Sequence, residues 1–144
     1  CVQAESPISP LFGDLAAFWK ALNEIGVVHA LGGSGLFRLL GVETAVNDWD
    51  ITTDADEPAI APIVRRYPHQ RLPATKTLLS HYAYRLRVGQ SNIDLIGGFR
   101  IGTDNGPVIV RTIVTGYHEG VPLGCPDEWR AAYRAMGRDV PNHR

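Results

Sequence analysis

The stretch Leu31–Asp54 has the sequence LGGSGLFRLLGVETAVNDWDITTD and joins a glycine-rich turn to a pair of carboxylates. The apolar run Val27–Leu31 predicts a buried strand that ends at Gly32, Gly33 and Ser34. Glycines let a backbone approach a ligand closely, and the free amides at a helix start attract phosphate oxygens. The stretch therefore predicts a phosphate-binding turn between a strand and a helix.

A short helix is expected over Leu36–Leu40, and thirteen residues separate Ser34 from Asp48. The segment Asp48–Ile51 alternates polar and apolar side chains, which predicts a second strand with Asp48 and Asp50 on one face. Carboxylates two residues apart on a strand lie about 7 Å from each other and repel unless a cation lies between them. Two or three such carboxylates favour Mg²⁺ completed by water and substrate phosphates.

At these residues the chain resembles the polymerase-beta-like nucleotidyltransferase superfamily. The signature of that superfamily is Gly-Gly or Gly-Ser, a spacer, Asp-x-Asp and a third carboxylate on a later strand; Gly33, Ser34, Asp48 and Asp50 match it. The segments GGSGLFRLLG and DWDITTDADEP are similar to the glycine turn and acidic strand in the head domain of tRNA CCA-adding enzymes and bacterial poly(A) polymerases. The resemblance implies an α+β nucleotidyltransferase fold, with a mixed, largely antiparallel sheet and flanking helices.

A hairpin is predicted downstream. Tyr82–Val88 alternates apolar and polar residues, Gly89 and Gln90 suit a two-residue type II′ turn, and Ser91–Ile96 returns antiparallel. This arrangement fixes the register of the two strands, because the turn has only two residues.

In that register Arg85 faces Asp94 and Arg87 faces Asn92. Asp94 is the candidate for the third carboxylate of the superfamily. The alternative is that Asp94 only forms a salt bridge with Arg85. Arg85 could also hold Asp94 in place, bind the triphosphate, or do both.

The remaining elements are expected to complete one domain, residues 1–144, with an irregular lead-in at 1–10 and a closing helix at 126–137. His29 is expected in the core, and Trp129 and Tyr133 on the packing face of the closing helix. The segment Tyr117–Gly124 is a loop or a short hairpin. Other helices are expected over Leu11–Ile25 and from Pro58 to Arg66, and a strand pair that extends the sheet over Phe99–Thr103 and Val108–Val114.

Bulk properties exclude several classes of protein. The 144 residues include 14 Lys and Arg against 15 Asp and Glu, so no basic field favours a long nucleic acid as partner. Cys1 and Cys125 form no pair motif, which indicates a reducing cytoplasm. No apolar run approaches the roughly 18 residues that cross a membrane. Because the chain begins at Cys1, its original start is expected to have been processed, trimmed or replaced, with a mature lipoprotein as the minor alternative.

The resemblance implies transfer of a nucleoside monophosphate from a nucleoside triphosphate, with ATP expected, to an acceptor hydroxyl with release of pyrophosphate. The acceptor is expected to be a small molecule or a protein, and base preference is left open. Two Mg²⁺ ions are expected. The implied catalytic and metal-binding residues are Asp48, Asp50 and Asp94, and the implied nucleotide-binding residues are Gly32, Gly33, Ser34, Arg85 and Arg87.

Other phosphate and nucleophile motifs do not match. The chain has no Gly-Lys-Ser or Gly-Lys-Thr of a P-loop, and the Gly-x-Ser-x-Gly elbow of serine hydrolases fails at Leu36. The main alternative is a non-catalytic nucleotide-binding domain, or a toxin–antitoxin-type interaction domain, that keeps the fold. A homo-oligomer or a partner subunit that completes the acceptor pocket is also open. A chance match of short motifs remains the third interpretation.

Overall fold

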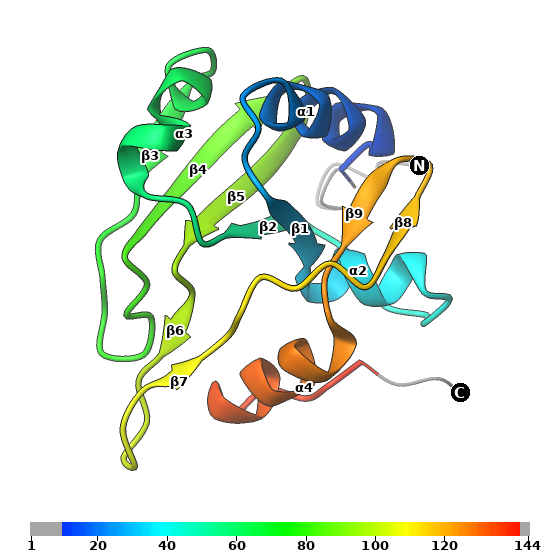
Figure 1. The fold of residues 1–144 in the computed structure, drawn as a ribbon. Helices are drawn as coiled ribbons and strands as arrows, with labels where there is room; N and C mark the ends of the chain where they lie inside the picture. Colours follow the sequence, from blue (N-terminus) through cyan, green and yellow to red (C-terminus); the bar gives the residue numbers. More distant parts are fainter. Residues whose placement is uncertain (1–9, 142–144) are drawn as a thin grey trace, which may run out of the picture.

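The structure, a computed structural model, describes residues 10–141 (Figure 1). Its helices are α1 (Phe12–Glu24), α2 (Gly33–Leu39), α3 (Glu57–Val64) and α4 (Pro126–Ala135). Its strands are β1 (His29–Gly32), β2 (Trp49–Thr53), β3 (His69–Arg71), β4 (Tyr82–Val88), β5 (Ser91–Gly97), β6 (Arg100–Ile101), β7 (Val108–Ile109), β8 (Gly116–His118) and β9 (Val121–Leu123).

The main sheet has seven strands in the order β3-β4-β5-β2-β1-β9-β8. Strand β2 is parallel to β5, and β1 is parallel to β9. The other four neighbouring pairs are antiparallel. The α+β class with a mixed, largely antiparallel sheet is therefore confirmed.

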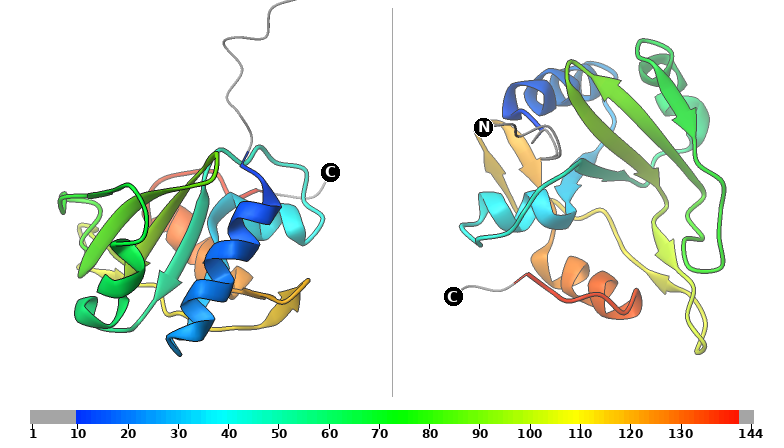
Figure 2. Two further views of the ribbon diagram at one scale, coloured as in Figure 1. Left: turned by 90° about the horizontal axis from the view of Figure 1, so that it is seen from above. Right: turned by 180° about the vertical axis from the view of Figure 1, so that it is seen from behind.

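The hydrophobic core lies between this sheet and helices α1 and α3, which contact each other and strand β4. Leu15 and Phe18 of α1 and Ile60 of α3 are fully buried there, in the same core cluster as Ile93 and Leu95 of β5. Figures 1 and 2 show α1 and α3 on the same side of the molecule, while α4 lies at the opposite end beside α2. Since side chains alternate along a strand, the residues between the core positions of β4, β5 and β2 face away from α1 and α3.

Polar contacts attach the start of α1 to the strands that carry the predicted site. Asp14 accepts hydrogen bonds from the Ser91 hydroxyl (2.6 Å) and the Gln90 amide (3.2 Å) at the β4–β5 turn. The carbonyl of Leu11 accepts a hydrogen bond of 3.1 Å from the indole nitrogen of Trp49. Trp49 lies between Asp48 and Asp50 in sequence, so this bond helps to fix the beginning of the acidic strand.

The predicted β4–β5 hairpin is confirmed, together with its register. Arg85 pairs with Asp94 and Arg87 with Asn92, and Gly89 has a φ of 60°, as the first central residue of a type II′ turn requires. The first and last helices lie within their predicted ranges. His29 is only 4% exposed, which confirms its expected place in the core.

Two expectations about local structure were wrong. The helix expected over Leu36–Leu40 is α2, which begins at Gly33 because the glycines follow the strand without an intervening loop. The pair expected over Phe99–Thr103 and Val108–Val114 shrinks to the two-residue strands β6 and β7, which form a separate sheet instead of extending the main one. The amide of Gly102, just after β6, donates instead to the carbonyl of Thr77 (2.7 Å), which ends the pairing there.

The main sheet is instead extended by β8 and β9, the short-hairpin alternative for Tyr117–Gly124. Within residues 10–141, no helix is long and apolar enough to cross a membrane.

Candidate active site

The glycine turn and the acidic strand meet directly. In the β1–β2 ladder Gly32 pairs with Asp50. Gly33 has a φ of 61°, and a Cβ atom there would lie 2.3 Å from the Oδ2 atom of Asp50. A Cβ atom at Gly32 would overlap the ring of Trp129 at 2.0 Å. Neither position can take a side chain without displacing the side chain of Asp50 or of Trp129, which gives a physical reason for both glycines.

Three carboxylates come together at two neighbouring strands, Asp50 and Asp94 within them and Asp48 just before one of them. Asp50 of β2 pairs in register with Asp94 of β5, and Asp48 immediately precedes β2. The guanidinium of Arg85 contacts Asp94 through two hydrogen bonds of 2.8 and 2.9 Å, and Asp48 through one of 3.2 Å. The structure therefore brings together all three predicted acidic residues and one of the two predicted arginines.

Asp50 is electrostatically the most perturbed of the three. Burial is the main cause that raises the pKa of its carboxyl to about 7, and repulsion from Asp94 and Asp48 adds to the rise. Arg138 and Arg85 oppose it through their positive charges. Perturbed carboxyl groups in a cavity are typical of functional sites, because a folded protein gains no stability from crowding negative charges.

The carboxylates suit a hard divalent cation in their donor chemistry. Their oxygens are the ligands that Mg²⁺ prefers, and a cation would relieve the repulsion around Asp50. Within the described part of the chain, however, no three acidic, His or Cys side chains are already gathered as a metal cluster. Here the guanidinium of Arg85 neutralises Asp48 and Asp94, so Asp48 and Asp94 could bind a metal only after partial release of that contact.

A cavity of about 300 Å³ opens over these residues. Its lining includes Ser34, at the start of α2, and the three carboxylates. The other lining residues come from the neighbouring strands and from segments as far along the chain as the end of α4: Asn47, Leu78, Arg85, Ile96, Phe99, Trp129, Tyr133, Met136 and Arg138. Trp129 and Tyr133 are 4% and 5% exposed, which confirms them as packing residues, and they also form a wall of the cavity.

Arg138 is a lining residue that the sequence analysis missed. It follows the end of α4, where Gly137 (φ 70°) and Arg138 donate backbone hydrogen bonds to the carbonyls of Arg134 (3.0 Å) and Tyr133 (2.9 Å). This is the hydrogen-bond pattern of a Schellman motif, which turns the chain back along its helix. The guanidinium of Arg138 then lies 5.3 Å from the ring centre of Tyr133. A glycine one residue past a helix, followed by an arginine, was the only local signal.

Arg87, the second predicted arginine, is not part of this lining. Its guanidinium donates to the side chain of Asn92 (3.1 Å) and to the carbonyl of Gln90 (3.4 Å), toward the β4–β5 turn. Binding a phosphate in the cavity would require Arg87 to leave both partners.

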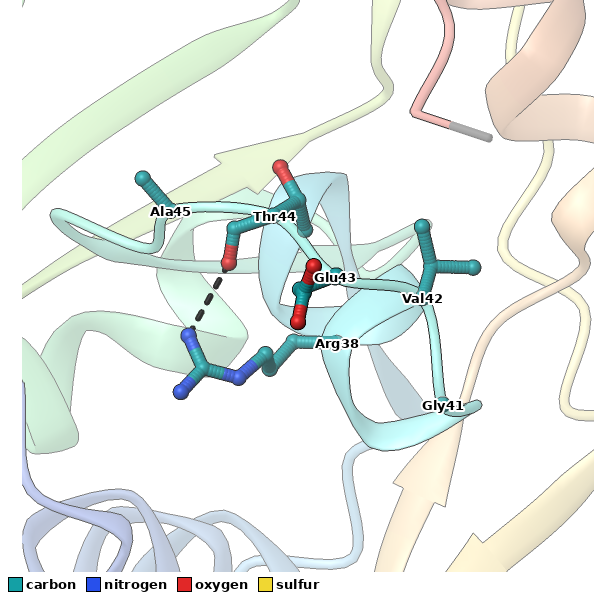
Figure 3. Close-up of a pocket in the computed structure, with 6 residues that line it drawn as sticks. All are labelled: Arg38, Gly41, Val42, Glu43, Thr44 and Ala45. Atoms are coloured by element: carbon teal, nitrogen blue, oxygen red, sulfur yellow. Dashed lines mark hydrogen bonds between the residues drawn. The ribbon is translucent and has the colours of Figure 1, made fainter. Parts of the chain in front are cut away.

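A wider hollow lies at the end of α2 (Figure 3). Its volume is about 580 Å³, and it is lined by Arg38 and by residues 41–45. The guanidinium of Arg38 donates a hydrogen bond to the carbonyl of Thr44 (2.9 Å). Glu43 is the single carboxylate of the hollow. The hollow brings no distant residues together, so the cavity over the carboxylates is the better candidate.

Two crystal structures share this fold. A "putative nucleotidyltransferase" from Thermotoga maritima matches with a TM-score of 0.69 and 23% identity, over 88% of this chain and 84% of that chain. ANT(2″)-Ia, in complex with adenylyl-2″-tobramycin, matches with a TM-score of 0.51 and 14% identity, over 88% of this chain and 91% of that chain. No family model and no curated protein matches the chain.

Both of these structures lie in the polymerase-beta-like nucleotidyltransferase superfamily. The chain has the nucleotidyltransferase fold, as the resemblance implied.

Proposed function

We propose that the protein is a Mg²⁺-dependent nucleotidyltransferase that moves a nucleoside monophosphate from a nucleoside triphosphate, ATP in the first instance, to an acceptor hydroxyl. One observation carries the proposal: a single cavity is lined by Ser34 next to the glycine turn and by Asp48, Asp50 and Asp94. The shared fold supports the same class of chemistry.

The triphosphate would bind between the glycine turn and the end of α4. The Ser34 hydroxyl can donate to a phosphate oxygen, and the first amides of α2 lack helical acceptors. Arg138 adds a cation that lines the cavity and has no carboxylate among the ion pairs of the described residues. The guanidinium of Arg138 also makes a cation–π contact with the ring of Tyr133, which helps to hold it in position.

Asp48 and Asp50 would hold one Mg²⁺ ion and, together with Asp94, a second. When bound, Mg²⁺ would neutralise charge on the triphosphate and on the departing pyrophosphate. Arg85, released from Asp48, would keep one of its two bonds to Asp94 and so hold that carboxylate toward the acceptor.

Transfer would then be an in-line displacement at the α-phosphorus. The acceptor hydroxyl gives its proton to Asp94, its oxygen forms a bond to the α-phosphorus, and the bond from that phosphorus to the bridging oxygen of the β-phosphate breaks. The products are a nucleotidylated acceptor and pyrophosphate.

Calorimetric titration of ATP, CTP, GTP and UTP, each with and without Mg²⁺, tests the proposal on the wild type and on Asp50→Asn. We expect Mg²⁺-dependent binding of at least one nucleotide, and loss of the Mg²⁺ dependence in the variant. Asp104→Asn, in the exposed β6–β7 turn, is the matched control. Failure of all four nucleotides to bind the wild type would overturn the proposal.

A non-catalytic nucleotide-binding domain is the second candidate. The observation in its favour is that Arg85 bonds two of the three carboxylates, as a purely structural salt bridge would. That candidate predicts nucleotide binding that does not respond to Mg²⁺, and no release of pyrophosphate from ATP.

A further inference from the structure

A second cavity adjoins the candidate active site. Its volume is about 110 Å³, and it shares Leu78, Asp94, Ile96 and Phe99 with the larger cavity. Most of its remaining lining comes from the segment after β3, including Ala74. Asp94 and Ser80 are the polar side chains of this lining, and every other residue in it is apolar.

The polarity of the sheet face changes along strands β4 and β5. On this face the cross-strand pair nearest the turn is Arg87 with Asn92, the next is the ion pair of Arg85 with Asp94, and the following one is Ala83 with Ile96. Asp94 therefore lies at the boundary between a charged region and an apolar one. A ligand group that reaches Asp94 from the second cavity lies on aliphatic side chains.

The segment that covers this apolar region is held in place by backbone hydrogen bonds. The amide of Thr75 donates to the carbonyl of Leu78 (2.9 Å), and the amide of Leu79 donates to the carbonyl of Arg100 (3.0 Å). Leu78 also forms a bridge to Ile101 of β6, yet it stays 45% exposed. An apolar cavity whose covering segment is anchored in this way is typical of a preformed small-molecule site.

We propose that the second cavity binds the apolar part of a small-molecule alcohol and thereby presents its hydroxyl to Asp94. The proposal rests on the proposed function and names the chemical class of its acceptor. A cavity of about 150 Å³ can hold benzene. The apolar part next to the hydroxyl is therefore a group of roughly four or five carbon atoms, such as a short branched alkyl chain.

The lining opposes a polycationic acceptor. Amines would need several carboxylates, but Asp94 is the single carboxylate of this cavity and it already bonds Arg85 twice. The charged side chain in the covering segment is Lys76, which is itself a cation. In this respect the inferred acceptor differs from the tobramycin adduct held by ANT(2″)-Ia.

The reaction of an alcohol bound at this site would form and break the same bonds as the proposed transfer. The alcohol loses its proton to Asp94, its oxygen bonds to the α-phosphorus of ATP, and pyrophosphate leaves. The product is an alkyl ester of AMP.

Amide NMR titrations with 3-methyl-1-butanol, glycerol and tobramycin test the inference, with Mg²⁺ and the non-transferable analogue α,β-methylene-ATP present. We expect saturable shifts with 3-methyl-1-butanol at the amides of Ala83 and Ile96. Ala74→Trp fills the cavity from an exposed position and should weaken this binding at least tenfold. Thr77→Trp, on the same segment but outside this lining, should leave it unchanged.

Ala83→Leu fills the same cavity from β4, and it provides a second test in case Ala74→Trp fails to fold. Binding of 3-methyl-1-butanol that survives both substitutions would overturn the inference, and so would preferential binding of tobramycin or glycerol. Analogue binding, measured in the same samples, separates the two proposals. If the analogue binds but the alcohol does not, the acceptor inference fails alone; if the analogue does not bind, the proposed function fails.

Discussion

At the scale of single residues, Asp50 is a buried carboxyl group whose ionisation destabilises the folded protein. Its carboxylate lies against the backbone of Gly33, close to two other carboxylates, and burial together with their repulsion raises its pKa to about 7. A raised carboxyl pKa means that the folded protein binds this proton more tightly than the unfolded chain does. In the absence of a divalent cation, the contribution of Asp50 to stability is therefore fully present below pH 4 and is lost as the pH rises toward 7 and above.

Asp50→Asn should remove this pH dependence. In EDTA at pH 8 we expect the variant to be more stable than the wild type by roughly 1–3 kcal/mol, because the amide carries no charge to bury. At pH 5 the difference should be much smaller. Urea unfolding at both pH values measures it, with Asp104→Asn as the control. Equal pH dependence of the wild type and Asp50→Asn would contradict the assignment of this perturbed carboxyl.

Arg138 is predicted to contribute to the binding of the outer phosphates of ATP. Arg138→Ala should weaken ATP binding about tenfold, since a hydrogen bond to a charged group contributes about 1.5–3 kcal/mol. Binding of AMP, which lacks the two outer phosphates, should change less. Arg134→Ala removes an exposed charge from the last turn of α4, outside the cavity, and should leave both affinities unchanged. Similar loss of ATP affinity in the two variants would indicate a general charge effect instead.

At the scale of secondary structure, sequence patterns correctly predicted the elements whose structure depends on residues close together in the sequence. The β4–β5 hairpin and its register followed from alternation and a two-residue turn, and the facing of Arg85 and Asp94 followed with them. Strands β6 to β9 have two or three residues each, and their pairing depends on distant segments such as β1 and the chain around Thr77. Such short strands carry too little periodicity to be assigned from sequence.

The conformation of Gly33 in the glycine turn is predicted to affect the stability of the protein. Gly33→Ala should destabilise the protein by about 1–2 kcal/mol, because its φ of 61° disfavours a side chain, and the contact with Asp50 should add to this. Gly13→Ala, in α1 with open space around it, should instead stabilise by about 0.5–1 kcal/mol. Urea unfolding measures both changes. Mg²⁺-dependent ATP binding should also fall in Gly33→Ala and not in Gly13→Ala. Equal stabilities of the two variants would show that the turn is less constrained than its geometry indicates.

At the scale of the whole molecule, the cavity exists because segments far apart in sequence close over one sheet face. The sequence predicted the acidic residues and Ser34, since each belongs to a local motif. It did not predict that Arg138 lines this cavity, because the position of Arg138 depends on the packing of α4 against the glycine turn through Trp129. It also did not predict the apolar cavity beside Asp94, which requires the segment after β3 to fold over Ala83.

Nucleotide transfer itself is best tested by incubating ATP, labelled separately at its α- and γ-phosphorus, with Mg²⁺, the protein and the small-molecule fraction of a cell extract. We expect the α-label to enter an acceptor while the γ-label leaves in pyrophosphate, and Asp50→Asn to abolish both changes. Transfer of the γ-label to an acceptor, or binding of ATP with neither label moved, would contradict this expectation.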